Sequence, residues 1–186
     1  MLKKMTIVAI TALVAGCTPP ADRLAMPALQ SQLQLQPRVN SALLRTVSLP
    51  TYAAVDEIAV ETPAGLIGAN QNVFWADDPQ RAVTLVLTRN LSDILNIDVG
   101  PEPWPFVELA DVAVDVRVAQ MLAGADGTFR LAGQYYVGGD RIAYRNSTHR
   151  FAIAVPMPDL SLGSIAEAQA RALLGLSEQI ARTLAR

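Results

Sequence analysis

Valine recurs at every second position in the middle of the chain, from Val112 to Val118, with polar or small residues between. Successive side chains of a β-strand point to opposite faces of a sheet, so this alternation predicts a strand whose valines enter the core. After a turn at 125–127 the alternation resumes and predicts a second strand. Its apolar face carries Phe129, Leu131, Tyr135 and Val137, and its polar face carries Arg130, Gln134 and Tyr136.

Gly138-Gly139-Asp140 is a hairpin signal that leads into a third strand, from Arg141 to about Val155. A polar break at 146–147 indicates a bend or a bulge within that strand. Shorter apolar runs predict the strands earlier in the chain: 42–49, a hairpin of 58–61 with 66–67, and 70–75 as an extension of that hairpin.

Two stretches have the three- and four-residue hydrophobic period of an amphipathic helix. The first begins at Asp77-Asp78-Pro79, where an acidic cap and a proline suit a helix N-terminus, and it ends near Asn96. The second runs from about residue 162 nearly to the C-terminus. The apolar stripes comprise Val83, Val86, Leu87, Leu91, Ile94 and Leu95 in the first helix and Ile165, Ala168, Ala172, Leu176, Ile180 and Leu184 in the second.

Together these elements predict an α+β fold, a largely antiparallel β-sheet with the two amphipathic helices packed on one face. The opposite face would carry polar side chains. An antiparallel sheet either leaves such a face to solvent, which is the favoured interpretation, or offers it to a partner. The candidate partner interface consists of Trp104 together with residues of this face, namely Asp115, Arg117, Arg130, Gln134 and Tyr136.

The N-terminus has the pattern of a lipoprotein signal peptide over residues 1–16. Lysines at positions 3 and 4 precede an apolar run over 5–14, and Val-Ala-Gly-Cys at 14–17 resembles the bacterial lipobox. As a helix the run would reach about 15 Å, half of a bilayer core of about 30 Å, so it is too short to span a membrane. We therefore predict lipidation of Cys17, against the alternative of an ordinary secretory signal with a coincidental cysteine.

Lipidation would anchor the mature protein. The resemblance implies that the cysteine carries a diacylglycerol and usually an added fatty acid such as palmitate, and two or more chains hold a protein stably on a bilayer. The residue after Cys17 is Thr18 and not Asp. Under the bacterial sorting rule that the lipobox implies, this favours the periplasmic face of the outer membrane over the inner membrane.

Proline and glutamine are frequent from Thr18 to about Asn40. This composition predicts a tether over residues 17–41, between the lipid and a single domain over residues 42–186. Leu33 and Leu35 alternate with glutamines, so a short edge strand is the alternative there.

Composition excludes several functions. Both lysines of the chain lie in the signal peptide, and without them 13 arginines stand against 17 acids. That balance does not suit nucleic-acid binding, and no lysine remains for a Schiff base or a phosphate ligand. With Cys17 acylated, no thiol remains for a disulfide or a thiolate metal site.

No catalytic, cofactor-binding or metal-binding residues are predicted. The single histidine, His149, shares the parity of Phe151 and Ile153 on a strand, and no nucleophile motif accompanies it. A packed or half-exposed strand histidine is therefore favoured over a base. Asp111 and Asp115 would lie about 13 Å apart along a strand, too far for an acid–base pair acting on one bond.

Two clusters of aromatic residues and prolines, around Trp75 and Trp104, have no chemical role in this scheme. Exposed tryptophans would indicate a binding surface, whereas buried ones would be core residues at element boundaries. The second interpretation is slightly favoured for both.

From about Leu43 to its C-terminus the chain resembles the ABC-type transport auxiliary lipoproteins, the PqiC-like family. The motifs that carry the resemblance are Leu49-Pro50-x-Tyr52, Phe74-Trp75-Ala76-Asp77-Asp78-Pro79 before a helix, Pro103-Trp104-Pro105, and Ala110-Asp111-Val112-x-Val114-x-Val116. The chain departs from the family at 23–26, where members often have an aromatic strand, and at 54–57, where members usually have Asp-Arg-Pro.

The resemblance implies a non-enzymatic lipoprotein that works with an MCE-domain periplasmic protein, an ABC permease and an ATPase in lipid movement between membranes. We expect an outer-membrane-anchored docking or assembly subunit, with a homo-oligomeric ring as one form of it. Two alternatives stay open: a structural envelope lipoprotein without a transporter, and a periplasmic lipoprotein that itself binds lipid in an interior cavity.

Overall fold

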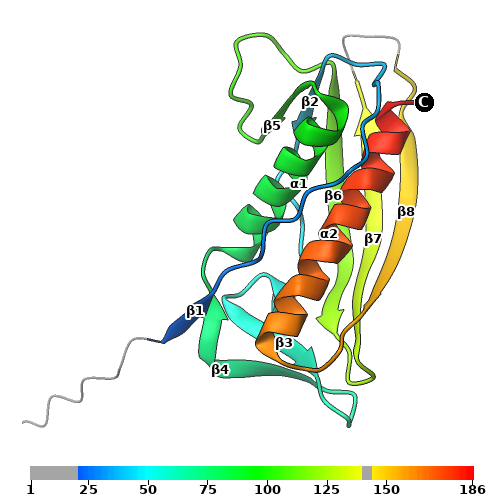
Figure 1. Ribbon diagram of the computed structural model, residues 1–186. Coiled ribbons are helices and arrows are strands. Elements are labelled where there is room, and N and C mark those ends of the chain that lie inside the picture. The colour runs from blue at the N-terminus through cyan, green and yellow to red at the C-terminus, as the bar shows by residue number, and fades with distance from the viewer. Residues whose placement is uncertain (1–20, 140–143) are drawn as a thin grey trace, which may run out of the picture.

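The computed structural model describes residues 21–139 and 144–186 (Figure 1). Cys17 and the predicted signal peptide therefore lie outside the described residues, and so does the start of the predicted third strand at 141–143.

Three long antiparallel strands form one side of the sheet, with β8 at its edge: β6 (Val112–Ala123), β7 (Thr128–Gly138) and β8 (Ser147–Pro156). The predicted alternation is confirmed, because all four valines from Val112 to Val118 are buried. The register of β6 and β7 shifts between Val118 and Gln120. Gly133 lies opposite this bulge, where a Cβ atom would lie 2.2 Å from the carbonyl oxygen of Arg117, so only glycine fits.

Five further strands complete the eight that the described residues contribute to the sheet: β1 (Asp22–Leu24), β2 (Ser41–Leu44), β3 (Glu57–Glu61), β4 (Ile67–Trp75) and β5 (Asp98–Pro101). The predicted hairpin and its extension are confirmed as β3 and β4. A short 3₁₀ helix, η1 (Thr51–Ala53), follows β2.

The sheet is mixed and not simply antiparallel. β2 pairs in parallel with both β5 and β6, β1 pairs in parallel with β4, and β3 meets β6 in parallel at one residue pair. The largely antiparallel character predicted from the sequence holds for the long strands. β1 and β5 were not predicted, because three or four residues are too few to show a two-residue period.

The strand predicted at 42–49 is regular only over β2. Beyond it the chain follows the edge of β6, with the Arg45 N–H donating to the Val114 carbonyl at 2.9 Å and the Ser48 N–H to the Val116 carbonyl at 3.0 Å. The Val47 N–H donates instead to the Thr84 hydroxyl at 3.0 Å, in the first helix. This side-chain contact interrupts the ladder.

Both predicted helices are confirmed, as α1 (Pro79–Leu95) and α2 (Leu162–Leu184). The Asp78 carboxylate caps α1 by accepting from the Arg81 N–H at 2.8 Å, and Asn96 ends it in the left-handed conformation. α1 packs against α2 and β5, and α2 packs against β7 and β8. Figure 1 shows α2 lying across β6, β7 and β8, with α1 beside it.

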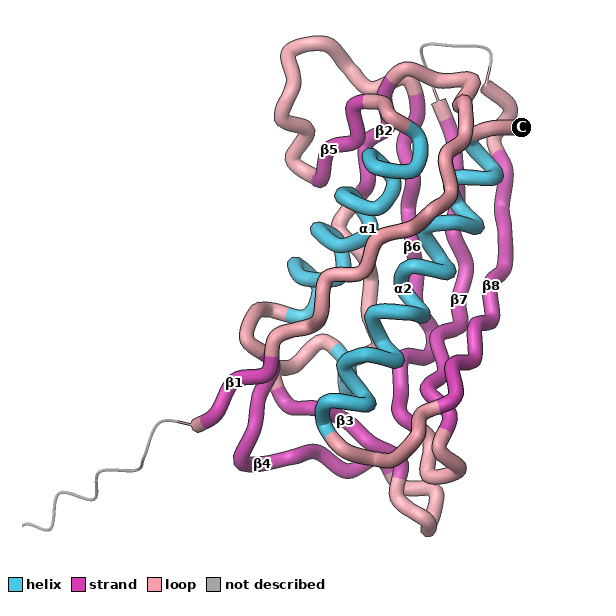
Figure 2. The backbone as a smooth tube through the Cα atoms, viewed as in Figure 1, coloured by secondary structure: helices cyan, strands magenta, loops and turns pink. Residues whose placement is uncertain are grey.

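The segment between β1 and β2 lies on the domain. Figure 2 shows it crossing both helices as a loop. The Leu35 N–H donates to the Ile94 carbonyl of α1 at 2.9 Å, and the Arg38 N–H to the Leu184 carbonyl of α2 at 3.1 Å. Val39 is buried with the core, and no strand is assigned over 25–40. From Asp22 onward this segment is thus packed and hydrogen-bonded, unlike the free tether that its composition predicts.

Candidate partner-binding surface

Four polar residues form a connected cluster on β6 and β7, which we call the polar cluster: Asp115, Arg117, Gln134 and Tyr136. The Arg117 guanidinium makes a two-point ion pair with the Asp115 carboxylate, at 3.2 Å from Nε and 3.0 Å from Nη2. Its Cζ lies 5.3 Å from the centre of the Tyr136 ring, a cation–π distance. The Tyr136 hydroxyl donates to the Gln134 amide oxygen at 3.2 Å.

The strand register produces this cluster. Asp115 lies directly opposite Tyr136, and Arg117 lies directly opposite Gln134. Opposed side chains on one face of an antiparallel pair lie close enough to interact. The hydrogen bond and the charge of Asp115 raise the pKa of Arg117, so the guanidinium stays charged.

Arg130 shares the face of these residues but not their position. It lies opposite Leu122, four residues along β7 from Gln134 and so about 13 Å away. Its guanidinium pairs with the Asp126 carboxylate in the β6–β7 turn. That hydrogen bond lowers the pKa of Asp126. The structure therefore separates Arg130 from the other predicted interface residues.

Trp104 lies in the loop over 102–111 that joins β5 to β6. Its indole N–H donates to the Glu108 carbonyl at 2.5 Å, and its ring lies 4.9 Å from the Phe106 ring, tilted by 60°. Gly100 lies against the indole, where a Cβ atom would be only 2.9 Å from the ring. These contacts fold the loop back on itself, and Figure 1 shows it projecting from the top of the molecule.

This loop exposes apolar side chains. Phe106 is 47% exposed, Leu109 is 69% exposed and Val107 is fully exposed. Exposed large apolar residues that cluster on one loop are more informative than scattered ones, because such patches mark interaction sites. These three residues were not predicted from the sequence, although Phe106-Val107 directly follows the prolines around Trp104.

One open cavity of about 590 Å³ joins the loop to the polar cluster. Trp104 and Leu109 form its loop side, and Asp115 and Tyr136 form its sheet side, with Arg45 also in the wall. Three of the residues predicted from the sequence therefore line one cavity, and Arg117 and Gln134 support it through Asp115 and Tyr136.

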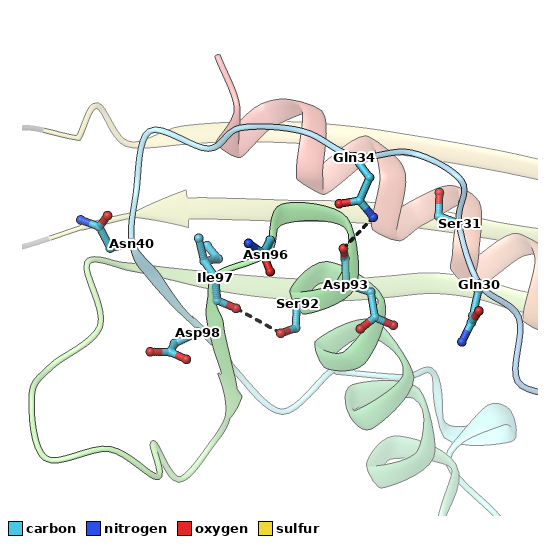
Figure 3. Close-up of a pocket in the computed structure, with 9 residues that line it drawn as sticks. All are labelled: Gln30, Ser31, Gln34, Asn40, Ser92, Asp93, Asn96, Ile97 and Asp98. Atoms are coloured by element: carbon cyan, nitrogen blue, oxygen red, sulfur yellow. Dashed lines mark hydrogen bonds between the residues drawn. The ribbon is translucent and has the colours of Figure 1, made fainter.

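Two other cavities lie elsewhere on the domain. The larger, about 830 Å³, lies between the N-terminal segment and the end of α1 (Figure 3). Its walls are mostly polar, and two of its lining residues are tied to the backbone: Gln34 donates to the Asp93 carbonyl and Ser92 to the Ile97 carbonyl. A small apolar cavity of about 250 Å³ lies beside Trp75 and Leu24. It is below the range of about 300–1,000 Å³ typical of ligand sites.

The other residues weighed for chemistry have structural surroundings. His149 is partly buried, stacks on Tyr135 at 4.9 Å and hydrogen-bonds to the Ser147 hydroxyl at 2.9 Å. Trp75 is buried in the core, and Asp111 accepts from the Asn40 N–H. Among residues 21–139 and 144–186, no group of three or more His, Cys, Asp or Glu side chains could hold a metal ion.

No helix in the described ranges is long and apolar enough to cross a bilayer. Cys17 lies outside those ranges, and its lipidation stays a prediction.

Comparisons with known proteins identify the family. Residues 23–181 match the family model of the ABC-type transport auxiliary lipoprotein component. No curated protein matches the chain. The match begins about twenty residues before the point where the resemblance was placed from the sequence, and so includes most of the packed N-terminal segment.

Two solved structures share the fold. A crystal structure of an uncharacterized protein has a TM-score of 0.69 and 17% identity, covering 87% of this chain and 98% of its own. A Xanthomonas campestris protein of the DUF330 family has a TM-score of 0.64 and 17% identity, covering 89% and 92%. The family match confirms the resemblance seen in the motifs, and the chain belongs to the ABC-type transport auxiliary lipoprotein family.

Proposed function

We propose that this protein is the outer-membrane-anchored docking or assembly subunit of an MCE-type lipid transport system. It would be lipidated at Cys17 and would act without catalysis, with ATP hydrolysis carried out by another subunit. Family membership supports the association with an ABC transport system. The lipobox pattern supports a lipid anchor at Cys17, and Thr18 supports the outer membrane as the membrane that holds it.

One observation carries the docking role: the cavity shared by Trp104, Asp115 and Tyr136 next to the exposed apolar side chains of the 102–111 loop. Protein interfaces combine a central aromatic or apolar anchor with a polar rim, and Trp, Tyr and Arg are enriched among the residues that matter most. The loop supplies the apolar part and the polar cluster supplies the rim. The proposed partner is the periplasmic MCE-domain protein.

Charge reversal at the polar cluster tests this proposal. In Arg117→Glu, the new carboxylate would face Asp115 and leave the Tyr136 ring without its cation, on a surface that the partner is proposed to cover. We expect loss of co-purification of the MCE-domain protein with the full-length lipoprotein from detergent-solubilised membranes. Trp104→Ala should weaken the same complex by about 30-fold, the equivalent of about 2 kcal/mol for a central interface residue.

Arg130→Glu is the matched control. It makes the same charge change on the same strand face, about 13 Å from the polar cluster, and should leave co-purification unchanged. Unchanged capture by Arg117→Glu and Trp104→Ala together would remove this surface from the docking role. The thermal unfolding of each variant should stay close to that of the wild type, since Arg117 and Trp104 are not buried.

The alternatives gain less support. A lipid-binding domain would need an enclosed apolar cavity, and these three cavities are open, with the most apolar of them at about 250 Å³. A structural lipoprotein without a transporter would lack a neighbouring gene for an MCE-domain protein and an ABC permease. Gene order therefore separates that alternative from the proposed function.

A further inference from the structure

The described chain begins very close to the predicted lipid anchor. Ala21 is four residues after Cys17, and four residues span at most about 14 Å even when fully extended. If Cys17 is acylated, as the proposed function requires, the start of β1 must lie within that distance of the bilayer surface. The free spacer expected from the composition would have allowed a far greater distance.

β1 is held firmly to the rest of the domain. It pairs with β4, with Asp22 opposite Val73 and Leu24 opposite Trp75. Arg23 makes an ion pair with Asp56 at 2.9 Å and donates to the Trp75 carbonyl at 2.9 Å. An anchor attached to β1 therefore restrains the orientation of the domain as well as its distance from the membrane.

The tip of the β3–β4 hairpin lies at the same end of the molecule as β1, and the 102–111 loop lies at the opposite end (Figure 1). At this tip Leu66 is 68% exposed and Ile67 is 47% exposed. No charged residue occurs between Glu61 and Asp77. The tip is thus an uncharged, apolar projection on the side where the anchor leaves the domain.

The backbone of this tip is already hydrogen-bonded. The Thr62 N–H donates to the Leu66 carbonyl at 2.7 Å, the Gly65 N–H to the Thr62 carbonyl at 2.9 Å, and the Leu66 N–H to the Thr62 hydroxyl at 3.2 Å. Unsatisfied backbone groups are what makes entry into lipid costly. A turn with internal partners can lie among lipid headgroups and place two apolar side chains below them.

The charges around this end indicate the kind of lipid. Asp126 in the β6–β7 turn is paired with Arg130, and the charge of Glu61 also attracts this arginine. Asp159, just before α2, accepts hydrogen bonds from Ser161 and Ser164, which lower its pKa to about 2 and keep it charged. Near β1, Asp22, Asp56 and Glu57 stand against Arg23, which is paired with Asp56. Six acids against two arginines at this end do not suit an anionic surface.

We infer that the β3–β4 hairpin tip rests on a zwitterionic lipid surface, with Leu66 and Ile67 inserted among the headgroups. The polar cluster and the 102–111 loop then point away from the anchoring membrane, toward a partner that arrives from the periplasm. The lipid anchor and the hairpin make two contacts with the bilayer, so they fix this direction.

A fluorescent label tests the contact. If Cys17 is acylated, as the proposed function requires, a cysteine introduced by Leu66→Cys can be labelled alone with an environment-sensitive dye. In full-length lipoprotein reconstituted into phosphatidylcholine vesicles, we expect a blue-shifted emission that doxyl-labelled lipids quench. The control is Val107→Cys, which is also apolar and is fully exposed but lies at the opposite end, and it should show neither effect.

The quenching results test the membrane contact and the kind of lipid separately. A label at position 66 without quenching, or quenched no more than one at position 107, overturns the membrane contact. Stronger quenching after one third of the lipid is replaced by phosphatidylglycerol overturns the choice of a zwitterionic surface. A label at Ala64 should lose its quenching when Leu66→Glu and Ile67→Glu are added, because the apolar side chains are then gone.

Mass spectrometry of the N-terminal peptide separates this inference from the proposed function. An unacylated Cys17 overturns both. An acylated Cys17 without quenching at position 66 overturns the hairpin contact alone and leaves the docking role in place.

Discussion

The two tryptophans occupy similar sequence surroundings and opposite environments. Both belong to family motifs that contain proline, but Trp75 is 8% exposed whereas Trp104 is only partly buried. Trp75 ends β4, pairs with Leu24 of β1 and precedes the cap of α1. The ring of Trp75 is therefore covered by regular elements, because β4 leads up to it and α1 begins soon after it.

Trp104 has no such enclosure. Prolines at 101, 103 and 105 remove backbone donors, so neither a strand nor a helix can continue through this segment. The indole is held by its own loop, through the Glu108 carbonyl and the Phe106 ring. A tryptophan at an element boundary is thus a core residue when the elements meet over it and a surface residue when a loop intervenes.

The largest loss of stability is expected for Trp75→Ala. Truncation of a buried tryptophan removes its packing and leaves a cavity, so we expect a loss of about 3–5 kcal/mol in the free energy of unfolding. Trp104→Ala should cost about 1 kcal/mol or less, because its side chain is only partly buried and lies on a surface loop. Urea denaturation followed by far-UV circular dichroism measures both. Similar losses for the two variants would contradict the contrast between core and surface.

A smaller effect is expected at the glycine beneath the Trp104 loop. A Cβ atom at position 100 would lie 2.8 Å from Pro105 Cδ and 2.9 Å from the Trp104 ring, so Gly100→Ala must displace the loop. We expect a cost of about 1–3 kcal/mol, as for other overpacked sites, together with a shift in tryptophan emission.

Gly68→Ala is the matched control for that variant. At this strand position a Cβ atom would meet nothing closer than 3.5 Å, the methyl group of Thr62. Its stability and emission should match the wild type. If Gly100→Ala behaves the same way, Trp104 is not held against the backbone, and the cavity shared with the polar cluster loses its loop side.

Parts of the fold that depend on nearby residues could be predicted from the sequence, and parts that depend on distant residues could not. α1, α2 and β6 each extend over at least twelve residues, enough for a hydrophobic period to repeat, and their predictions are confirmed. The packing of the N-terminal segment depends on bonds between residues far apart in sequence, such as Leu35 with Ile94. Proline and glutamine content carries no information about such distant partners.

The candidate site also combines features that the sequence predicts with features that depend on tertiary packing. Strand parity correctly grouped Asp115 with Arg117, and Gln134 with Tyr136, because alternation decides which face a side chain occupies. Parity gives the face and not the position along the strand, but the four-residue step from Arg130 to Gln134 already implies a separation of about 13 Å, so the sequence contained this distinction. Parity could not place Trp104 at the same cavity, since that depends on how the 102–111 loop folds back.

The smallest changes in stability are expected for two adjacent tyrosines of β7. Tyr135 is 3% exposed and its hydroxyl lies 2.8 Å from that of Thr183 in α2, whereas Tyr136 lies in the polar cluster. Tyr135→Phe should cost about 0.5–1.5 kcal/mol through the lost hydrogen bond. Tyr136→Phe should change stability by no more than about 0.5 kcal/mol, as at most surface sites.

Alkaline pH sharpens this contrast. Burial raises the pKa of Tyr135, so the fold holds its hydroxyl in the neutral form, whereas an unfolded tyrosine ionises near pH 10. The resulting stability is fully present below about pH 10 and is lost as the pH rises through the raised pKa of the folded state. The free energy of unfolding of the wild type should therefore fall as the pH rises above about 10. It should fall less in Tyr135→Phe, with a remainder from Tyr144, whose pKa burial also raises. An equal alkaline fall in both proteins would mean that the hydroxyl of Tyr135 is not protected by α2.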